Sequence, residues 1–198
     1  MASVLTPDRF VAPTVKESAK IVVAGSFGVG KTTFVASVSE VPPVRMEESV
    51  TGASERVDDL ARTPAKTTTT VGVDFGRKHL SDDLVLYLFG TPGQARFGFL
   101  WQELVIGALG ALVLVDPRDL EASHEILGLL EDHGVPFAVV VNLFDDAPRY
   151  PPAEIHEALA LDAGTLLTEC DARQPASCIE ALIQLVEHLA RDQHALES

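Results

Sequence analysis

A glycine-rich octapeptide near the start of the chain has the residue types to bind a phosphate group. Its sequence, GSFGVGKT, matches the phosphate-loop (P-loop) pattern G-x-x-x-x-G-K-[ST] and lies between a β-branched run and a helical stretch. The glycines let backbone N–H groups turn towards phosphates, and the helix start adds partial positive charge. We expect the Lys31 amine to reach the β and γ phosphates and the Thr32 hydroxyl to bind Mg²⁺. The predicted phosphate site is Gly25, Ser26, Phe27, Gly28, Val29, Gly30, Lys31, Thr32 and Thr33.

Apolar runs alternate with helical patterns along the rest of the chain. The runs read as strands that are covered on both faces, and they are Lys20–Ala24, Leu84–Phe89, Ala111–Val115, Phe137–Asn142 and Thr165–Glu169. Helical patterns occupy residues 120–131, 152–160 and 176–190. This alternation predicts an α/β fold with a doubly wound, mostly parallel sheet. The polar segment 41–70 interrupts it and predicts a long, mobile loop.

Composition and charge exclude several classes of function. The 198 residues favour one domain, which we place at residues 20–192 between a leader (1–19) and a tail (193–198). The net charge of −14 argues against nucleic acid as a partner. Two cysteines are too few for a disulfide framework, which predicts a cytoplasmic protein. The apolar stretch 97–115 contains Gln102 and Glu103, so we predict no membrane span, although partners could recruit the protein to a membrane.

The sequence NLFD, residues 142–145, begins at the last residue of the predicted strand Phe137–Asn142. In isolation such a pattern is also typical of a turn or an Asx cap. It resembles the N-K-x-D guanine motif of Ras-like GTPases, with Leu143 in place of Lys. The resemblance implies that Asp145 accepts hydrogen bonds from guanine N1 and N2, and that Asn142 holds the loop and the base edge. The ECDAR sequence resembles the E-T-S-A-K loop of the same family, which places the Ala172 N–H on guanine O6 and adds Cys170, Asp171 and Ala172 to the implied base site.

Two further segments resemble the nucleotide-sensing switches of this family. TVGVDF, residues 70–75, looks like the T-I-G-V-D-F of Rab-like proteins, which implies that Thr70 binds Mg²⁺ and the γ-phosphate; the alternative is a plain strand start. FGTPGQ, residues 89–94, looks like W-D-T-A-G-Q, which implies that Gly93 contacts the γ-phosphate and Gln94 orients the attacking water. The implied catalytic residues are Gln94, Lys31 and Thr70, and the implied metal ligands are Thr32 and Thr70.

The main departure from the family is Gly90, which stands where the resemblance calls for a Mg²⁺-associated Asp. We expect weaker metal affinity as a result, by analogy with second-shell losses. Asp116, after the next strand, is a candidate replacement, or else it caps the end of its strand. Arg77 and Arg96 lie near the switches and are candidates for an arginine finger, or else they are solvated.

Taken together, these motifs resemble bacterial Ras-like small GTPases of the conservon type over residues 20–190, with the bacterial polarity GTPase as a more distant match. The resemblance implies a three-layer P-loop NTPase fold with six strands, of which 71–80 is antiparallel to the rest. It implies a Mg²⁺-dependent GTP/GDP switch with slow hydrolysis, working with a roadblock-fold regulator and a sensor-kinase-like membrane protein in signalling. Two alternatives stay open: a pseudo-GTPase that binds nucleotide without hydrolysis, and a nucleotide kinase or ATPase.

Overall fold

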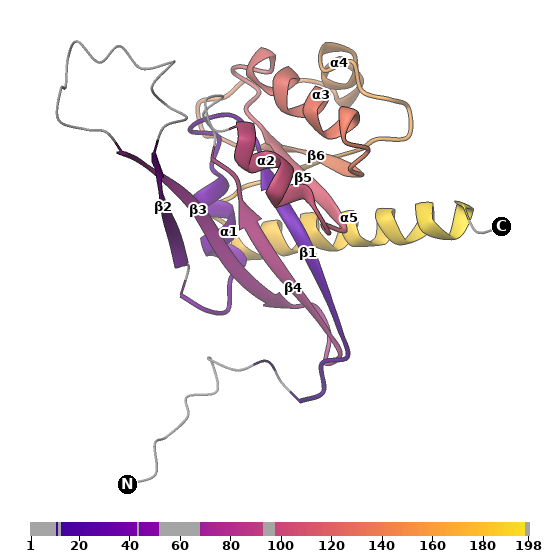
Figure 1. Ribbon diagram of the computed structural model, residues 1–198. Helices are drawn as coiled ribbons and strands as arrows, with labels where there is room; N and C mark the ends of the chain where they lie inside the picture. Colours follow the sequence, from indigo (N-terminus) through magenta and orange to yellow (C-terminus); the bar gives the residue numbers. More distant parts are fainter. Residues whose placement is uncertain (1–10, 12, 43, 52–67, 93–97, 197–198) are drawn as a thin grey trace, which may run out of the picture.

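The computed structural model describes residues 11, 13–42, 44–51, 68–92 and 98–196. They form an α/β fold of the P-loop NTPase kind around one sheet with the strand order β2-β3-β4-β1-β5-β6-β7 (Figure 1). The strands are β1 (Glu17–Ala24), β2 (Val44–Thr51), β3 (Thr68–His79), β4 (Leu84–Gly90), β5 (Gly110–Val115), β6 (Phe137–Asn142) and β7 (Leu166–Cys170). β4, β1, β5, β6 and β7 pair in parallel, whereas β3 is antiparallel to both of its neighbours.

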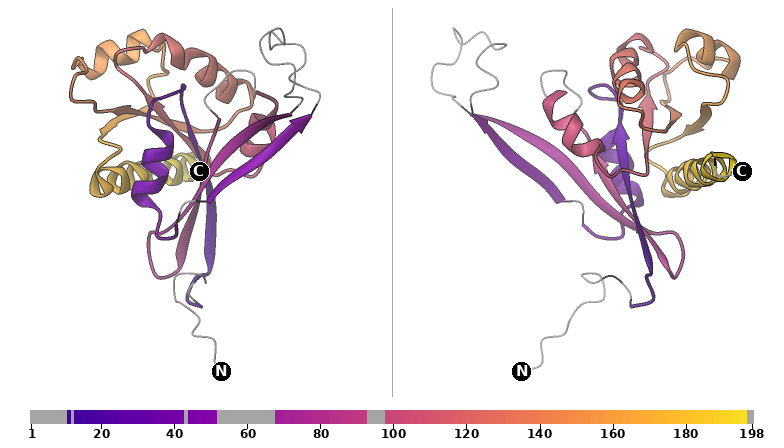
Figure 2. Two further views of the ribbon diagram at one scale, coloured as in Figure 1. Left: turned by 90° about the vertical axis from the view of Figure 1, so that its left-hand side faces the viewer. Right: turned by 45° about the vertical axis from the view of Figure 1, so that its right-hand side comes forward.

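Helices cover both faces of the sheet and give the fold three layers (Figure 2). Their bounds are α1 (Lys31–Val38), α2 (Gly98–Val105), α3 (His124–Asp132), α4 (Pro152–Ala158) and α5 (Pro175–Leu196), with a short 3₁₀ turn, η4 (Glu121–Ser123), before α3. Successive side chains of a strand point to opposite faces. Accordingly, Ile21 and Val23 of β1 pack in a core with α1 and α5, while Val22 and Ala24 pack in a second core with α2, α3 and α4.

The six predicted strands all form, and the predicted antiparallel strand is β3. The prediction of a loop over residues 41–70 is wrong at both of its ends, because 44–51 form β2 and β3 begins at Thr68. β2 pairs only with β3 at the edge of the sheet, so it does not need the apolar run by which a buried strand is recognised. β1 begins inside the predicted leader and α5 ends inside the predicted tail.

The parallel strands bring the candidate site residues to one edge of the sheet. The P-loop follows β1, Asp116 follows β5, Asn142 ends β6, and Cys170 ends β7. Ligands of open α/β sheets bind at this carboxyl edge. None of the helices in the described ranges is long and apolar enough to span a membrane.

Candidate functional site

Backbone geometry explains two glycines of the P-loop. Gly25 has φ +142°, and a Cβ there would lie 2.4 Å from the carbonyl oxygen of Leu114. Gly30 has φ +106°, and a Cβ there would lie 2.6 Å from Nδ2 of Asn142. Both positions combine a backbone conformation that L-residues rarely adopt with a close approach of other atoms. The loop can therefore make this turn only with glycine at these two points.

The P-loop ends in a helix start that has no side-chain cap. α1 begins at Lys31 after Gly30, which has no side chain to supply a capping oxygen, so the first N–H groups of the helix are available to an anion. The Lys31 side chain is buried, and its Nζ donates to the carbonyl oxygens of Gly25 at 2.8 Å and Ser26 at 2.7 Å. Burial lowers the pKa of Lys31 to about 8, against the opposing effect of the nearby Asp74 charge.

Asp74 is a candidate site residue that sequence reasoning missed. It lies on β3 directly opposite Gly90 of β4, and its carboxylate accepts a hydrogen bond from the Thr32 hydroxyl. A Cβ on Gly90 would lie 3.1 Å from Asp74 Cβ and 3.5 Å from Asp74 Oδ2. A carboxylate from the neighbouring strand thus lies beside the position at which the resemblance implies one. The signal was present in the sequence, because Asp74 is the one acidic residue of TVGVDF and its strand pairs antiparallel with FGTPGQ.

Asp116 does not take the place of the missing carboxylate. Its oxygens accept from the backbone N–H of Arg118 at 2.9 Å and from the Arg118 guanidinium at 2.7–3.2 Å. Arg118 holds the pKa of Asp116 below its usual range. The same guanidinium bonds Asp146 at 3.0 Å and lies 3.9 Å from the ring centre of Phe144. The structure thus supports the alternative, in which Asp116 caps its strand, and Arg118 braces the loop after β6.

The other switch candidates have different outcomes. Arg77 is buried on β3, and its backbone N–H donates to Ser39 Oγ at 3.2 Å. It lies three residues beyond Asp74, or about 10 Å along the strand, so neither the solvated reading nor a role at the phosphates fits it. The backbone at Thr70 belongs to β3. The remaining candidates, Gly93, Gln94 and Arg96, lie outside the described residues.

One buried amide joins the P-loop to both loops of the predicted base site. Asn142 is 4% exposed; its Nδ2 donates to Val29 O at 2.8 Å, and its Oδ1 accepts from Ala172 N–H at 3.0 Å. Ser37 of α1 adds a bond from Oγ to Ala172 O at 2.6 Å. The N–H of Ala172, expected to donate to guanine O6, is therefore bound to Asn142, and contact with a base would require it to share or leave that bond.

Asp145 and the loop after β7 meet through an ion pair. Asp145 is 84% exposed, and both of its oxygens accept from Arg173, at 2.9 Å each. Arg173 holds the pKa of Asp145 below its usual range. Arg173 Nε also bonds Asp171 at 2.8 Å. The residues predicted to read a base thus lie together, with Arg173 between them.

Cys170 contributes through its backbone and not through its thiol. Its side chain is fully buried beside Cys178, which with burial raises the pKa of the Cys170 thiol. Its carbonyl oxygen accepts from Leu143 N–H at 2.8 Å, which aligns the loop after β6 with the end of β7.

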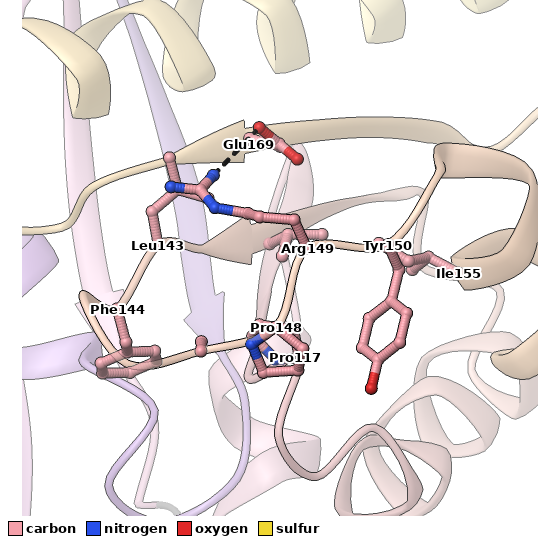
Figure 3. A pocket seen from close by; sticks show the side chains of 10 residues that line it. Pro117, Leu143, Phe144, Pro148, Arg149, Tyr150, Ile155 and Glu169 are labelled. Carbon is pink, nitrogen blue, oxygen red and sulfur yellow. Dashed lines mark ion pairs between the residues drawn. The ribbon is translucent and has the colours of Figure 1, made fainter.

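Leu143 lines a small pocket behind the same loop (Figure 3). Arg149 crosses this pocket to pair with Glu169 at 3.7 Å, and Tyr150 lies at its other end. The lining comes from the strand ends and loops after β5 and β6, from β7 and from α4: Pro117, Val141, Leu143, Phe144, Ala147, Pro148, Arg149, Tyr150, Ile155 and Glu169. Leu143, which stands where the resemblance implies a Lys, thus lies among these groups.

The fold and the phosphate loop define a P-loop nucleotide-binding protein. Residues 23–192 match the family described as "Conserved hypothetical ATP binding protein", and the chain belongs to that family. The chain is also 30% identical over 132 residues to an uncharacterized protein of Methanocaldococcus jannaschii, an alignment that covers 66% of this chain and 73% of the relative. Nucleotide binding is therefore a property of the family, and its description names ATP.

Proposed function

We propose that this protein is a Mg²⁺-dependent guanine-nucleotide switch that binds GTP and GDP and hydrolyses GTP slowly. The observation that carries the proposal is the buried Asn142 amide, which fixes the loop bearing Asp145 against the P-loop. An exposed carboxylate is thereby held at the carboxyl edge of the sheet, on a loop that is bonded to the P-loop. Guanine presents two adjacent N–H donors to such a carboxylate, whereas adenine has no matching pair.

The oxygen groups beside α1 fit a hard divalent cation. The Thr32 hydroxyl and the Asp74 carboxylate already meet, and Mg²⁺ prefers such oxygen ligands together with phosphate oxygens and water. Bound Mg²⁺ would neutralise charge on the phosphates. Thr32 and Asp74 would hold it. Lys31 would exchange its bonds to loop carbonyls for bonds to the β and γ phosphates.

Hydrolysis and signalling are the finer parts of the proposal. Gln94 would orient the attacking water and Gly93 would sense the γ-phosphate, with intrinsic turnover on the order of 10⁻⁴ to 10⁻³ per second. The resemblance to conservon-type small GTPases supports a cytoplasmic role with a roadblock-fold regulator and a sensor-kinase-like membrane partner. The second candidate function is ATP binding, favoured by the family description. The third is a pseudo-GTPase that binds nucleotide and releases no phosphate.

The base assignment is tested by binding of fluorescent GDP, GTP and ATP to nucleotide-stripped protein. We expect guanine nucleotides to bind far more tightly than ATP. Asp145→Asn should weaken the binding of GDP and strengthen the binding of xanthosine diphosphate, because an amide can donate to the xanthine C2 carbonyl. Asp146→Asn is the matched control, since Asp146 is a neighbouring exposed carboxylate that pairs with Arg118 instead. Tight ATP binding, or equal losses for every nucleotide in Asp145→Asn, would favour the ATP-binding alternative.

The metal assignment is tested by the Mg²⁺ concentration needed for half-maximal GTP binding. Asp74→Asn should raise it by about 10–100-fold. The double variant Asp74→Gly, Gly90→Asp returns a carboxylate to the same space from the other strand and should recover most of the lost Mg²⁺ affinity. Asp83→Asn, an exposed acid bonded to Ser81, is the control. Phosphate release over hours, with Gln94→Leu as the slowed variant, separates a GTPase from a pseudo-GTPase.

A further inference from the structure

The Asp145 carboxylate is bound by a side chain whose donors have the same arrangement as those of guanine. Arg173 directs two parallel N–H groups, from Nη1 and Nη2, at Oδ2 and Oδ1 of Asp145, at 2.9 Å each. A guanine base would direct its N1–H and N2–H at the same two oxygens. In both cases two adjacent donors meet one carboxylate in a bidentate pair. Arg173 and a guanine base therefore need the same acceptors.

The position of Arg173 is built into the loop after β7. Asp171 accepts from the Arg173 backbone N–H at 2.9 Å, from Nε at 2.8 Å and from Nη2 at 2.9 Å. The loop is fixed in turn by the bond between Ala172 N–H and the buried Asn142. The guanidinium is thus held from behind while its outer edge faces Asp145, and little ordering is needed to form the pair.

We propose that Arg173 is an internal competitor for the base-recognition carboxylate and sets the guanine-nucleotide affinity of this protein. The inference rests on the proposed guanine specificity of Asp145. A base binds by exchanging with the guanidinium, so each binding event breaks the pair with Arg173 and each release re-forms it. Asp145 is exposed and the pair is screened by water, so its effect on affinity is moderate.

The test compares GDP affinity in wild type and Arg173→Ala. We expect the variant to bind GDP about 2–5-fold more tightly, as removal of an exposed bidentate pair predicts. The gain should shrink at high salt, where the pair in the wild type is already weakened. Arg173→Lys, which keeps the charge and loses the paired donors, should show part of the gain.

Two controls separate competition from general effects of charge. Arg149→Ala removes an exposed arginine at the same edge, paired with Glu169 (Figure 3), and should leave GDP affinity within about twofold of wild type. In an Asp145→Ala background, Arg173→Ala should no longer tighten GDP binding, because no carboxylate is left to compete for. Carbon NMR of the Asp145 carboxyl checks the pair itself: its pKa should rise towards the ordinary value in Arg173→Ala.

The outcomes distinguish this inference from the proposed function. If wild type prefers guanine nucleotides and Arg173→Ala leaves GDP affinity unchanged or weakens it, the competition is refuted and guanine recognition stands. An Asp145 pKa that does not respond to Arg173→Ala also refutes it. If wild type binds ATP and not GDP, the proposed function fails, and the competition fails with it.

Discussion

Removal of the Asn142 side chain should destabilise the protein even without nucleotide. In Asn142→Ala, the carbonyl oxygen of Val29 and the N–H of Ala172 lose their bonds, and both residues are at most 2% exposed. Each buried polar group left unpaired costs about 1–3 kcal/mol. Some relaxation of the P-loop offsets this cost, so we expect the free energy of unfolding to fall by about 2–4 kcal/mol. That is a large part of the roughly 5–15 kcal/mol that stabilises a domain, and corresponds to a melting temperature lower by about 5–15 °C.

Urea unfolding followed by tryptophan fluorescence measures this loss directly. Trp101 is the one tryptophan of the sequence and is 4% exposed, so its emission reports on unfolding. Ser37→Ala is the matched control, because it removes a single half-buried bond to Ala172 O and should cost about 1 kcal/mol. An Asn142→Ala variant no less stable than Ser37→Ala would refute the assignment of Asn142 as the link between the loops.

Two further predictions concern the P-loop. GDP affinity should fall about tenfold between pH 7 and pH 9, because the pKa of Lys31 is about 8 and roughly one amine in ten is charged at pH 9. Phosphates favour the charged amine, so binding above pH 8 should take up a proton, which calorimetry in buffers of different ionisation enthalpy detects; flat affinity would contradict the pKa. Gly25→Ala should cost more than about 3 kcal/mol, since its Cβ meets Leu114 O and its φ is positive. Gly28→Ala, where φ is positive but a Cβ would meet open space, should cost about 1 kcal/mol of stability. Equal melting temperatures of the Gly25→Ala and Gly28→Ala variants would contradict this reasoning.

The features that the sequence predicted well are those encoded by neighbouring residues. The P-loop is eight consecutive residues with a fixed pattern, and the central strands are apolar because both of their faces are covered. The resemblance implies that Asn142 holds its loop and the base edge, and in the structure its amide bonds Val29 O and the Ala172 N–H. In each case the residue type that the local sequence pattern requires is also the one that the folded structure needs at that position. The local pattern is therefore sufficient to predict the feature.

The features that were missed depend on which strands and loops become neighbours. β2 is a polar edge strand, so its single pairing with β3 leaves no apolar signature. Asp74 lies opposite Gly90 because β3 and β4 pair in a particular register, and a register is a relation between two strands. The contact between Asp145 and Arg173 joins residues 28 positions apart whose loops meet only at the sheet edge.

The loop that carries Asp145 and the P-loop share one structural element, the Asn142 amide, and this would link nucleotide binding to stability. Asn142 joins the loop of Asp145 to Val29 of the P-loop, so loosening either loop strains the bonds that hold the other. A nucleotide that contacts both loops binds only the folded protein, and at 100 times its dissociation constant it adds about 2.7 kcal/mol of stability. Under the proposed function, a base contact at Asp145 and a phosphate contact at the P-loop would therefore not be fully independent. Substitutions at Asp145 and Lys31 should therefore combine non-additively in nucleotide binding.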